Sequence, residues 1–304
     1  MAVRIVTYLL LAVLSGAGTA AQQGPVFRSE AEIVRIDVLV KRSGAPVRGL
    51  TAADFEVRDG GQLQSLEPMQ QEDAPIDVAL VLDLSQSVHG AKLSALRDAA
   101  GAFLDGLRPR MTADRPGTEG DRAALLVFHE EVQLVEPLTS ALDRLRAALQ
   151  AVAARGSTAL LDATYAGLRL LEPGPRRSIV VVFSDGVDSL SWLTSAQVVE
   201  AAAHSDAVVY AVEAREKGDP ENPFLDAVTR ATGGRVWTAR SEKELRPRFL
   251  DVLDEIRSRY VLSYAPQGVG FTGWHAVEVR LKRGSGEVRA RPGYFRTTPT
   301  PEVP

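Results

Sequence analysis

The stretch VALVLDLSQSVHG, residues 78–90, decides the fold, because a fully apolar run in it ends abruptly in polar residues. Val78 to Leu82 do not alternate with polar residues, which indicates a strand that is buried on both faces. If the chain stays extended after Leu82, a period of two directs the oxygens of Asp83, Ser85 and Ser87 to one side. The stretch is therefore either a strand end followed by a helix cap or one part of a metal site.

Similar apolar runs recur along the chain, and amphipathic helical patterns lie between them. Apolar residues step by three and four over residues 93–107 and again over residues 142–149. Buried strands that alternate with helices predict right-handed crossovers and a parallel sheet. We therefore expect an α/β domain over residues 76–256, with an open, doubly wound, mostly parallel sheet and helices on both faces. The runs that we assign to its strands are DVALVLD, RAALLVF, SIVVVFSD and AVVYAVEA.

The segments on both sides of this domain have the alternation of antiparallel strands. In the N-terminal region, residues 26–74, every second residue from Val34 to Val40 is apolar, and glycines interrupt the pattern. In the C-terminal region, residues 259–297, the segment from Val277 to Leu281 alternates in the same way. Since the termini of a domain usually lie close together, we expect the two regions to form a small β-sandwich. Residues 298–304 are expected to be a tail.

The first 21 residues have the pattern of an export signal, with one basic residue, an apolar centre and small residues before the expected cleavage site. The alternative is an uncleaved N-terminal anchor. The chain has no cysteine, so disulfides cannot stabilise it and its core has to do so alone. These features predict a periplasmic or secreted protein with no membrane span after cleavage.

Three polar clusters fall where the predicted strands and helices meet, and open parallel sheets bind ligands beyond the carboxyl ends of their strands. The first holds Asp83, Ser85 and Ser87. The second is GSTALLDA, with Thr158, and the third is SDGVD, with Asp185. Together they offer two carboxylates and three hydroxyls, all hard oxygen ligands, which suit Mg²⁺ and also admit Mn²⁺ or Ca²⁺.

Two further carboxylates lie near these clusters and are secondary candidates. Asp162 follows Thr158 by four residues on the same predicted helix face, where it either orients the threonine loop or acts as a solvated or capping group. Asp188 follows Asp185 by three residues and is expected to hold its own loop.

The pattern Asp-x-Ser-x-Ser, the later threonine and SDGVD resemble the metal-ion-dependent adhesion site (MIDAS) of von Willebrand factor type A domains, which have a Rossmann-like fold. All five positions of that motif are occupied. The resemblance implies that Ser85, Ser87 and Thr158 coordinate the metal, and that Asp83 and Asp185 act directly or through water. It also implies that an acidic residue of a partner protein completes the metal's coordination.

The flanking regions resemble those of bacterial exported proteins related to von Willebrand factor type A. One residue departs from the motif, because Gln86 stands where the family often has glycine or another small residue. A larger side chain at that position is expected to narrow the approach to the metal.

Three classes of function are compatible with these patterns. The first is a metal-dependent protein-binding module, and the second is a structural scaffold with an incidental metal site. The third is a hydrolase that uses Asp83 or Ser184, but the sequence has neither a nucleophile elbow nor a phosphate-binding loop. A net charge of −4 argues against a nucleic-acid partner. The sequence leaves the identity of the protein partner and the oligomeric state open.

Overall fold

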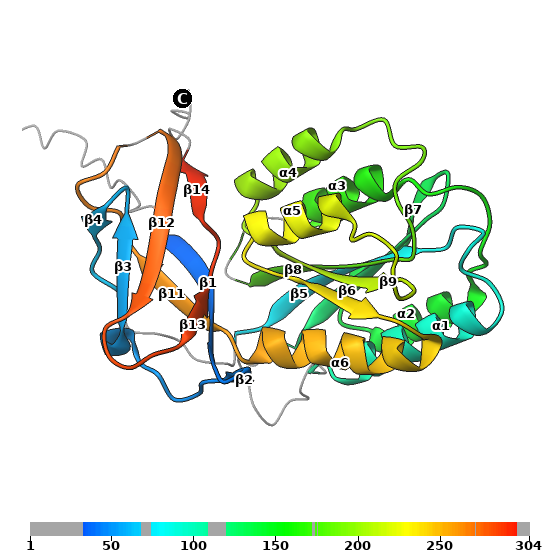
Figure 1. Cartoon of the computed structure of the whole chain (residues 1–304), viewed down its shortest axis with the longest axis horizontal. Coiled ribbons are helices and arrows are strands. Elements are labelled where there is room, and N and C mark those ends of the chain that lie inside the picture. The colour runs from blue at the N-terminus through cyan, green and yellow to red at the C-terminus, as the bar shows by residue number, and fades with distance from the viewer. Residues whose placement is uncertain are drawn as a thin grey trace, which may run out of the picture. The chain divides into compact units, whose positions relative to one another are not determined.

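The apolar runs of the sequence form the centre of a six-stranded sheet in the computed structural model (Figure 1). The structure describes residues 33–67, 74–108, 120–171, 174, 176–270 and 272–296. The expected export signal and the expected tail lie outside these residues. The strands, in spatial order, are β10 (Val236–Ala239), β9 (Val208–Ala214), β8 (Arg177–Ser184), β5 (Ile76–Asp83), β6 (Arg122–Phe128) and β7 (Val132–Thr139).

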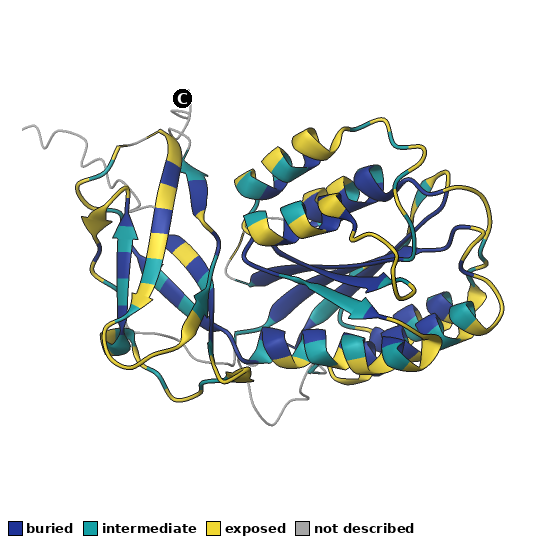
Figure 2. Cartoon of the chain, in the orientation of Figure 1, coloured by how far each residue is buried: buried dark blue, intermediate teal, exposed yellow. Residues whose placement is uncertain are grey.

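The sheet is mostly parallel, as the sequence predicted. Neighbouring strands run parallel from β10 to β6, and β7 alone pairs antiparallel with its neighbour, with irregularities in the register. All eight residues of β5 and all eight of β8 are buried, as Figure 2 shows by their dark blue colour. The central strands therefore hold the carboxyl ends of β5 and β8 side by side.

Helices cover both faces of this sheet. Side chains of β5 at even positions pack with α1, α2 and α6, and those at odd positions with α3, α4 and α5 (Figure 1). The helices are α1 (Ala91–Asp105), α2 (Leu142–Ala151), α3 (Leu160–Leu170), α4 (Ser195–His204), α5 (Pro223–Ala231) and α6 (Glu242–Arg257).

Two helical glycines meet different surroundings. A Cβ added at Gly167 in α3 would lie 2.8 Å from Val81 Cγ2 on β5, so this helix packs close to the sheet because the residue has no side chain. A Cβ added at Gly101 in α1 would meet nothing within 4 Å.

The flanking strands form two further sheets that share one apolar core, which is the small β-sandwich expected from the sequence. The first sheet holds β1 (Val34–Arg42) between β11 (Tyr260–Tyr264) and β13 (Glu287–Arg289), with β2 (Ala45–Pro46) beside β1. The second is ordered β14 (Gly293–Arg296), β12 (Gly273–Leu281), β3 (Phe55–Asp59) and β4 (Gln62–Leu63), and a short 3-10 helix, Ala52–Asp54, precedes β3. Their shared core includes Ile36, Val38, Val57, Leu262 and Tyr264.

N-terminal and C-terminal segments pair directly in both sheets. In the first sheet Asp37 of β1 stands opposite Val261 of β11, and in the second Val57 of β3 stands opposite Val279 of β12. Neither sheet can therefore form from one end of the chain alone.

Buried polar groups tie β1 to the α/β layer. The side chain of Arg259, two residues after the end of α6, is fully buried, and its Nε donates to the Tyr210 hydroxyl at 2.6 Å. Its Nη1 donates to the Asp37 carbonyl oxygen at 3.2 Å, and Arg177 Nε donates to the Asp37 carboxylate at 2.8 Å. A buried guanidinium that lost these acceptors would be costly, so the contacts fix β1 against the sheet.

A second buried polar group, Asp77, lies near the start of β5. The Asp77 carboxylate accepts hydrogen bonds from Arg122 Nε at 2.9 Å and from Arg176 Nε at 2.5 Å. Burial alone would raise the pKa of Asp77, but these two guanidinium groups outweigh it and hold the pKa below its usual range.

Candidate metal centre

Asp83 ends β5 and is fully buried at the carboxyl edge of the sheet. One carboxylate oxygen accepts the backbone N–H of Ser85 at 2.9 Å, and the other accepts the Ser184 hydroxyl at 2.7 Å. Burial raises the pKa of Asp83 to about 6, although hydrogen bonds from Ser85 and Ser184 act in the opposite direction and the nearby Asp185 adds to the increase. The protein alone therefore compensates little of the negative charge of the buried Asp83 carboxylate.

Ser85, Ser87 and Asp185 form a continuous chain of hydrogen bonds beside Asp83. The hydroxyls of Ser85 and Ser87 are 3.0 Å apart, and the Ser87 hydroxyl donates to Asp185 Oδ1 at 2.8 Å. The second Asp185 oxygen accepts from Lys92 Nζ at 2.6 Å. The structure therefore brings four of the five predicted ligands together and adds an ammonium group to them.

Thr158 lies on a neighbouring loop whose backbone is bonded to the Asp83–Ser87 turn. Gln86 N–H donates to the Gly156 carbonyl at 3.0 Å, and Arg155 N–H donates to the Leu84 carbonyl at 2.8 Å. Thr158 is buried, but within the described residues no hydrogen bond links its hydroxyl to the other four predicted ligands. The Gln86 side chain is exposed.

Asp162 and Asp188 bind the backbone of the loop Gly186–Leu193, and their described hydrogen bonds do not include the four clustered ligands. Asp162 accepts the N–H groups of Trp192 at 2.9 Å and Leu193 at 3.0 Å. Asp188 accepts the Leu161 N–H at 3.1 Å and the Ser191 hydroxyl at 2.5 Å. Asp188 therefore holds its own loop, as expected from the sequence, whereas Asp162 holds the loop at Trp192 and Leu193 and not the threonine loop that the sequence analysis considered for it.

The donor set fits a hard divalent cation. Asp83 and Asp185 have side chains with almost no exposure, and the Lys92 ammonium offsets only one of their two negative charges. The described part of the chain contains no group of three or more His, Cys, Asp or Glu residues that could hold a metal. Oxygen-rich sites with few carboxylates and several hydroxyls suit Mg²⁺, Mn²⁺ or Ca²⁺ better than a soft metal.

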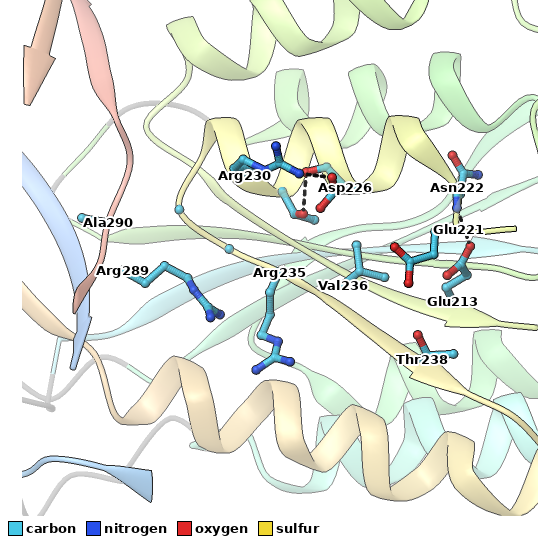
Figure 3. A pocket seen from close by; sticks show the side chains of 13 residues that line it. Glu213, Glu221, Asn222, Asp226, Arg230, Arg235, Val236, Thr238, Arg289 and Ala290 are labelled. Carbon is cyan, nitrogen blue, oxygen red and sulfur yellow. Dashed lines mark hydrogen bonds and ion pairs between the residues drawn. The ribbon is translucent and has the colours of Figure 1, made fainter. Parts of the chain in front are cut away.

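A cavity of about 390 Å³ lies beside β10, between α5 and β13 (Figure 3). Its charged lining is internally compensated, because each ionisable side chain has an ion-pair partner among the described residues. Glu213 and Glu221 pair with Arg215, Asp226 pairs with Arg230, and Arg235 and Arg289 both lie within 4.0 Å of Glu255. The buried anionic charge at Asp83 makes the carboxyl edge of β5 and β8 the stronger candidate site.

Two residues at the site have roles that their sequence positions did not indicate. Ser184 was considered only as a nucleophile, yet it is fully buried and its hydroxyl donates to Asp83. Lys92 carries no motif, and its pairing with Asp185 depends on where α1 begins. The signal available for Ser184 was its place directly before Asp185 at the end of an apolar run.

The site lies within a segment that matches a known domain. Residues 78–187 match the family model of the von Willebrand factor type A domain. No curated protein matches the chain. A solved von Willebrand factor type A structure from Catenulispora acidiphila is 13% identical, with a TM-score of 0.54, and the match covers 84% of this chain and 75% of that chain.

Proximal thread matrix protein 1 from the mussel byssus, solved with a zinc-occupied MIDAS motif, is a further structural neighbour. It is 17% identical with a TM-score of 0.51, and the match covers 63% of this chain and 48% of that chain. This chain thus spans about half the length of that protein, and at such identities the likeness shows the fold alone. Residues 78–187 thus match the von Willebrand factor type A domain in sequence, and the order of the sheet and the fold of these neighbours agree with that match.

Proposed function

We propose that this protein is an exported interaction module that binds a divalent cation and, through it, an acidic side chain of a partner protein. The von Willebrand factor type A fold is that of a protein-interaction module, which supports the general class. The observation that carries the specific proposal is the cluster of two buried carboxylates and two hydroxyls at the carboxyl ends of β5 and β8.

The site offers two kinds of ligand for the cation, hydroxyls and carboxylates. We assign Ser85, Ser87 and Thr158 as hydroxyl ligands, and Asp83 and Asp185 as carboxylates that bind directly or through water. The cation, Mg²⁺, Mn²⁺ or Ca²⁺, supplies a positive centre that attracts a carboxylate from outside. Neutral hydroxyl ligands that bind directly, together with a carboxylate that acts through water, leave that centre electrophilic, because they neutralise less of its charge than directly bound carboxylates would.

Binding is a better account of this site than hydrolysis. A serine nucleophile must reach its substrate, and it needs an adjacent base that accepts its proton. The Ser184 side chain has 0% exposure and its hydroxyl donates to a carboxylate that is itself buried. Ser184 and Asp83 therefore have a structural role, because both side chains are buried beneath the site.

We also propose that the protein acts in the periplasm or outside the cell, after removal of residues 1–21. The apolar, weakly charged N-terminus and the absence of cysteine support export. Within the described part of the chain, no helix has the length and apolar character needed to cross a membrane.

Calorimetric titration with Mg²⁺ and Mn²⁺ tests the metal site. We expect the wild type to bind and Asp83→Asn to lose binding. The Asp83→Asn protein should still fold, because the buried charged form of Asp83 is disfavoured and its amide replacement has a similar shape. Asp143→Asn is a matched control, since the Asp143 side chain is 99% exposed. Equal binding by the wild type and Asp83→Asn would contradict the proposal.

A further inference from the structure

We infer that the loop Gly186–Leu193 is a contact surface for the partner, and that the partner carries a large apolar side chain close to its acidic residue. The inference rests on the proposed function, because it concerns what surrounds the carboxylate that the metal would bind. Its starting point is three apolar side chains, Val187, Leu190 and Trp192, which we call the apolar loop.

The apolar loop is unusually exposed. The exposed fractions are 65% for Val187, 51% for Leu190 and 95% for Trp192. Only nine large hydrophobic residues are exposed in the described part of the chain, so three of the nine fall within six consecutive positions. Single exposed apolar residues are common, but a cluster that includes a fully exposed tryptophan is typical of a binding surface.

Hydrogen bonds to the loop backbone keep this loop in one conformation. Asp162 accepts from the N–H groups of Trp192 and Leu193, and Asp188 accepts from the Ser191 N–H and hydroxyl. These contacts fix the backbone on both sides of the exposed tryptophan. A surface that is already ordered before binding loses little conformational entropy when a partner binds, which favours affinity.

The loop is continuous with the candidate metal centre. It follows Asp185 directly, and Ser189 joins it to the threonine loop, where its N–H donates to the Thr158 carbonyl at 2.9 Å. The Thr158 N–H donates in turn to the Ser189 hydroxyl at 3.1 Å. The apolar loop is therefore bonded to two of the segments that provide predicted ligands.

Charge indicates what occupies this surface. With a divalent cation bound, the two site carboxylates are neutralised, and the Lys92 ammonium, which stays at the rim of the site even when it turns from Asp185 toward water, leaves one net positive charge. An acidic side chain complements that charge, whereas the apolar loop next to it offers no charged group. The occupant that satisfies both parts is a protein segment in which Asp or Glu is accompanied by an aromatic or large aliphatic residue.

A displayed peptide library tests the inference on the full chain. Heptapeptides with a central Asp and random flanks are selected in Mg²⁺ and eluted with EDTA, next to a library with Asn at the centre. We expect enrichment only from the Asp library, with aromatic or large aliphatic residues near the Asp. Peptides selected on the wild type should bind Trp192→Ser at least tenfold more weakly, because a central tryptophan often dominates an interface.

Two measurements separate this contact from the metal site itself. Trp192→Ser should bind Mg²⁺ like the wild type in calorimetry, since Trp192 has no polar contact with the predicted ligands through its side chain. Trp274→Ser, which removes a tryptophan of 44% exposure from β12, is the matched control and should bind the selected peptides normally.

Three results would overturn the inference. Acidic peptides with no apolar preference, bound equally by Trp192→Ser, would leave the metal site as proposed but remove the apolar loop from recognition. Failure of the Asp library to enrich in Mg²⁺ would overturn the proposed function and the inference with it. Self-association of the wild type in sedimentation, absent in Trp192→Ser, would make a second copy of the chain the occupant.

Discussion

The ion pair between Lys92 and Asp185 is expected to weaken metal binding. Lys92 Nζ lies 2.6 Å from Asp185 Oδ2, and the Asp185 side chain is only 1% exposed. An incoming cation has to share this carboxylate with the ammonium or displace it. Replacing Lys92 with Met, which keeps the aliphatic length of the side chain, should therefore increase the affinity for Mg²⁺.

The size of the increase follows from the environment of the pair. The Lys92 side chain is 31% exposed, so it can turn toward water when the cation enters, and solvent screens much of its charge. A partly exposed ion pair of this kind contributes about 1 kcal/mol or less. A difference of about 1 kcal/mol corresponds to roughly a fivefold lower dissociation constant.

Calorimetric titration with Mg²⁺ at constant ionic strength measures the change. Lys243→Met is the matched control, because Lys243 is exposed on α6 and has no described contact with the site. We expect it to leave the dissociation constant unchanged. An affinity of Lys92→Met equal to or below that of the wild type would refute the idea that the ammonium competes with the metal.

Three further predictions concern stability and order. Asp77→Asn should lower the free energy of unfolding at pH 7. Because the folded state lowers the pKa of Asp77, the stabilisation that its carboxylate provides is lost as the pH falls below about 4. The denaturant midpoints of the wild type and Asp77→Asn should therefore converge at low pH. Asp162→Ala should speed amide hydrogen exchange at residues 190–193 while hardly changing exchange in β5, and unchanged exchange at both places would refute its role in holding the loop. Gly167→Ala should destabilise the fold by about 1–3 kcal/mol because the new methyl group meets β5, whereas Gly101→Ala should be neutral or stabilise it by up to about 1 kcal/mol, both measured by denaturant unfolding.

The sequence predicted four of the five parallel strands, β5, β6, β8 and β9, because these strands are buried on both faces. Val78 to Leu82 and the matching run in β8 contain almost nothing but apolar residues, and few other structures bury such runs. The two edge strands, β7 and β10, were not identified. Strand β7 is partly exposed, contains Pro137 and has an irregular register, and β10 is only four residues long and partly buried, so neither sequence carries much periodic signal.

The candidate site was predictable to a similar, partial extent. The sequence grouped Asp83, Ser85 and Ser87 on the condition that the chain stays extended, but β5 ends at Asp83 and the chain turns, with the Val88 N–H donating to the Ser85 carbonyl. The turn still brings the three residues together, and Asp185 joins them. The contact of Lys92 depends on Gly90, which has a φ of +57° before α1, and no spacing rule gives that angle. The sequence did not predict the exposure of the Trp192 side chain either, because a tryptophan in a loop can lie in the core or on the surface.

The position of β1 in its sheet has a consequence for the order in which the chain can fold. Its last residues pair locally with the two-residue strand β2, but its other partners, β11 and β13, lie about 220 residues or more further along, so most of this apolar strand stays unpaired until those segments have been made. Pairing over such a separation is slow, and the β-sandwich should be the last part to assemble. The α/β layer has all its own strands and helices between residues 76 and 257 and can collapse first.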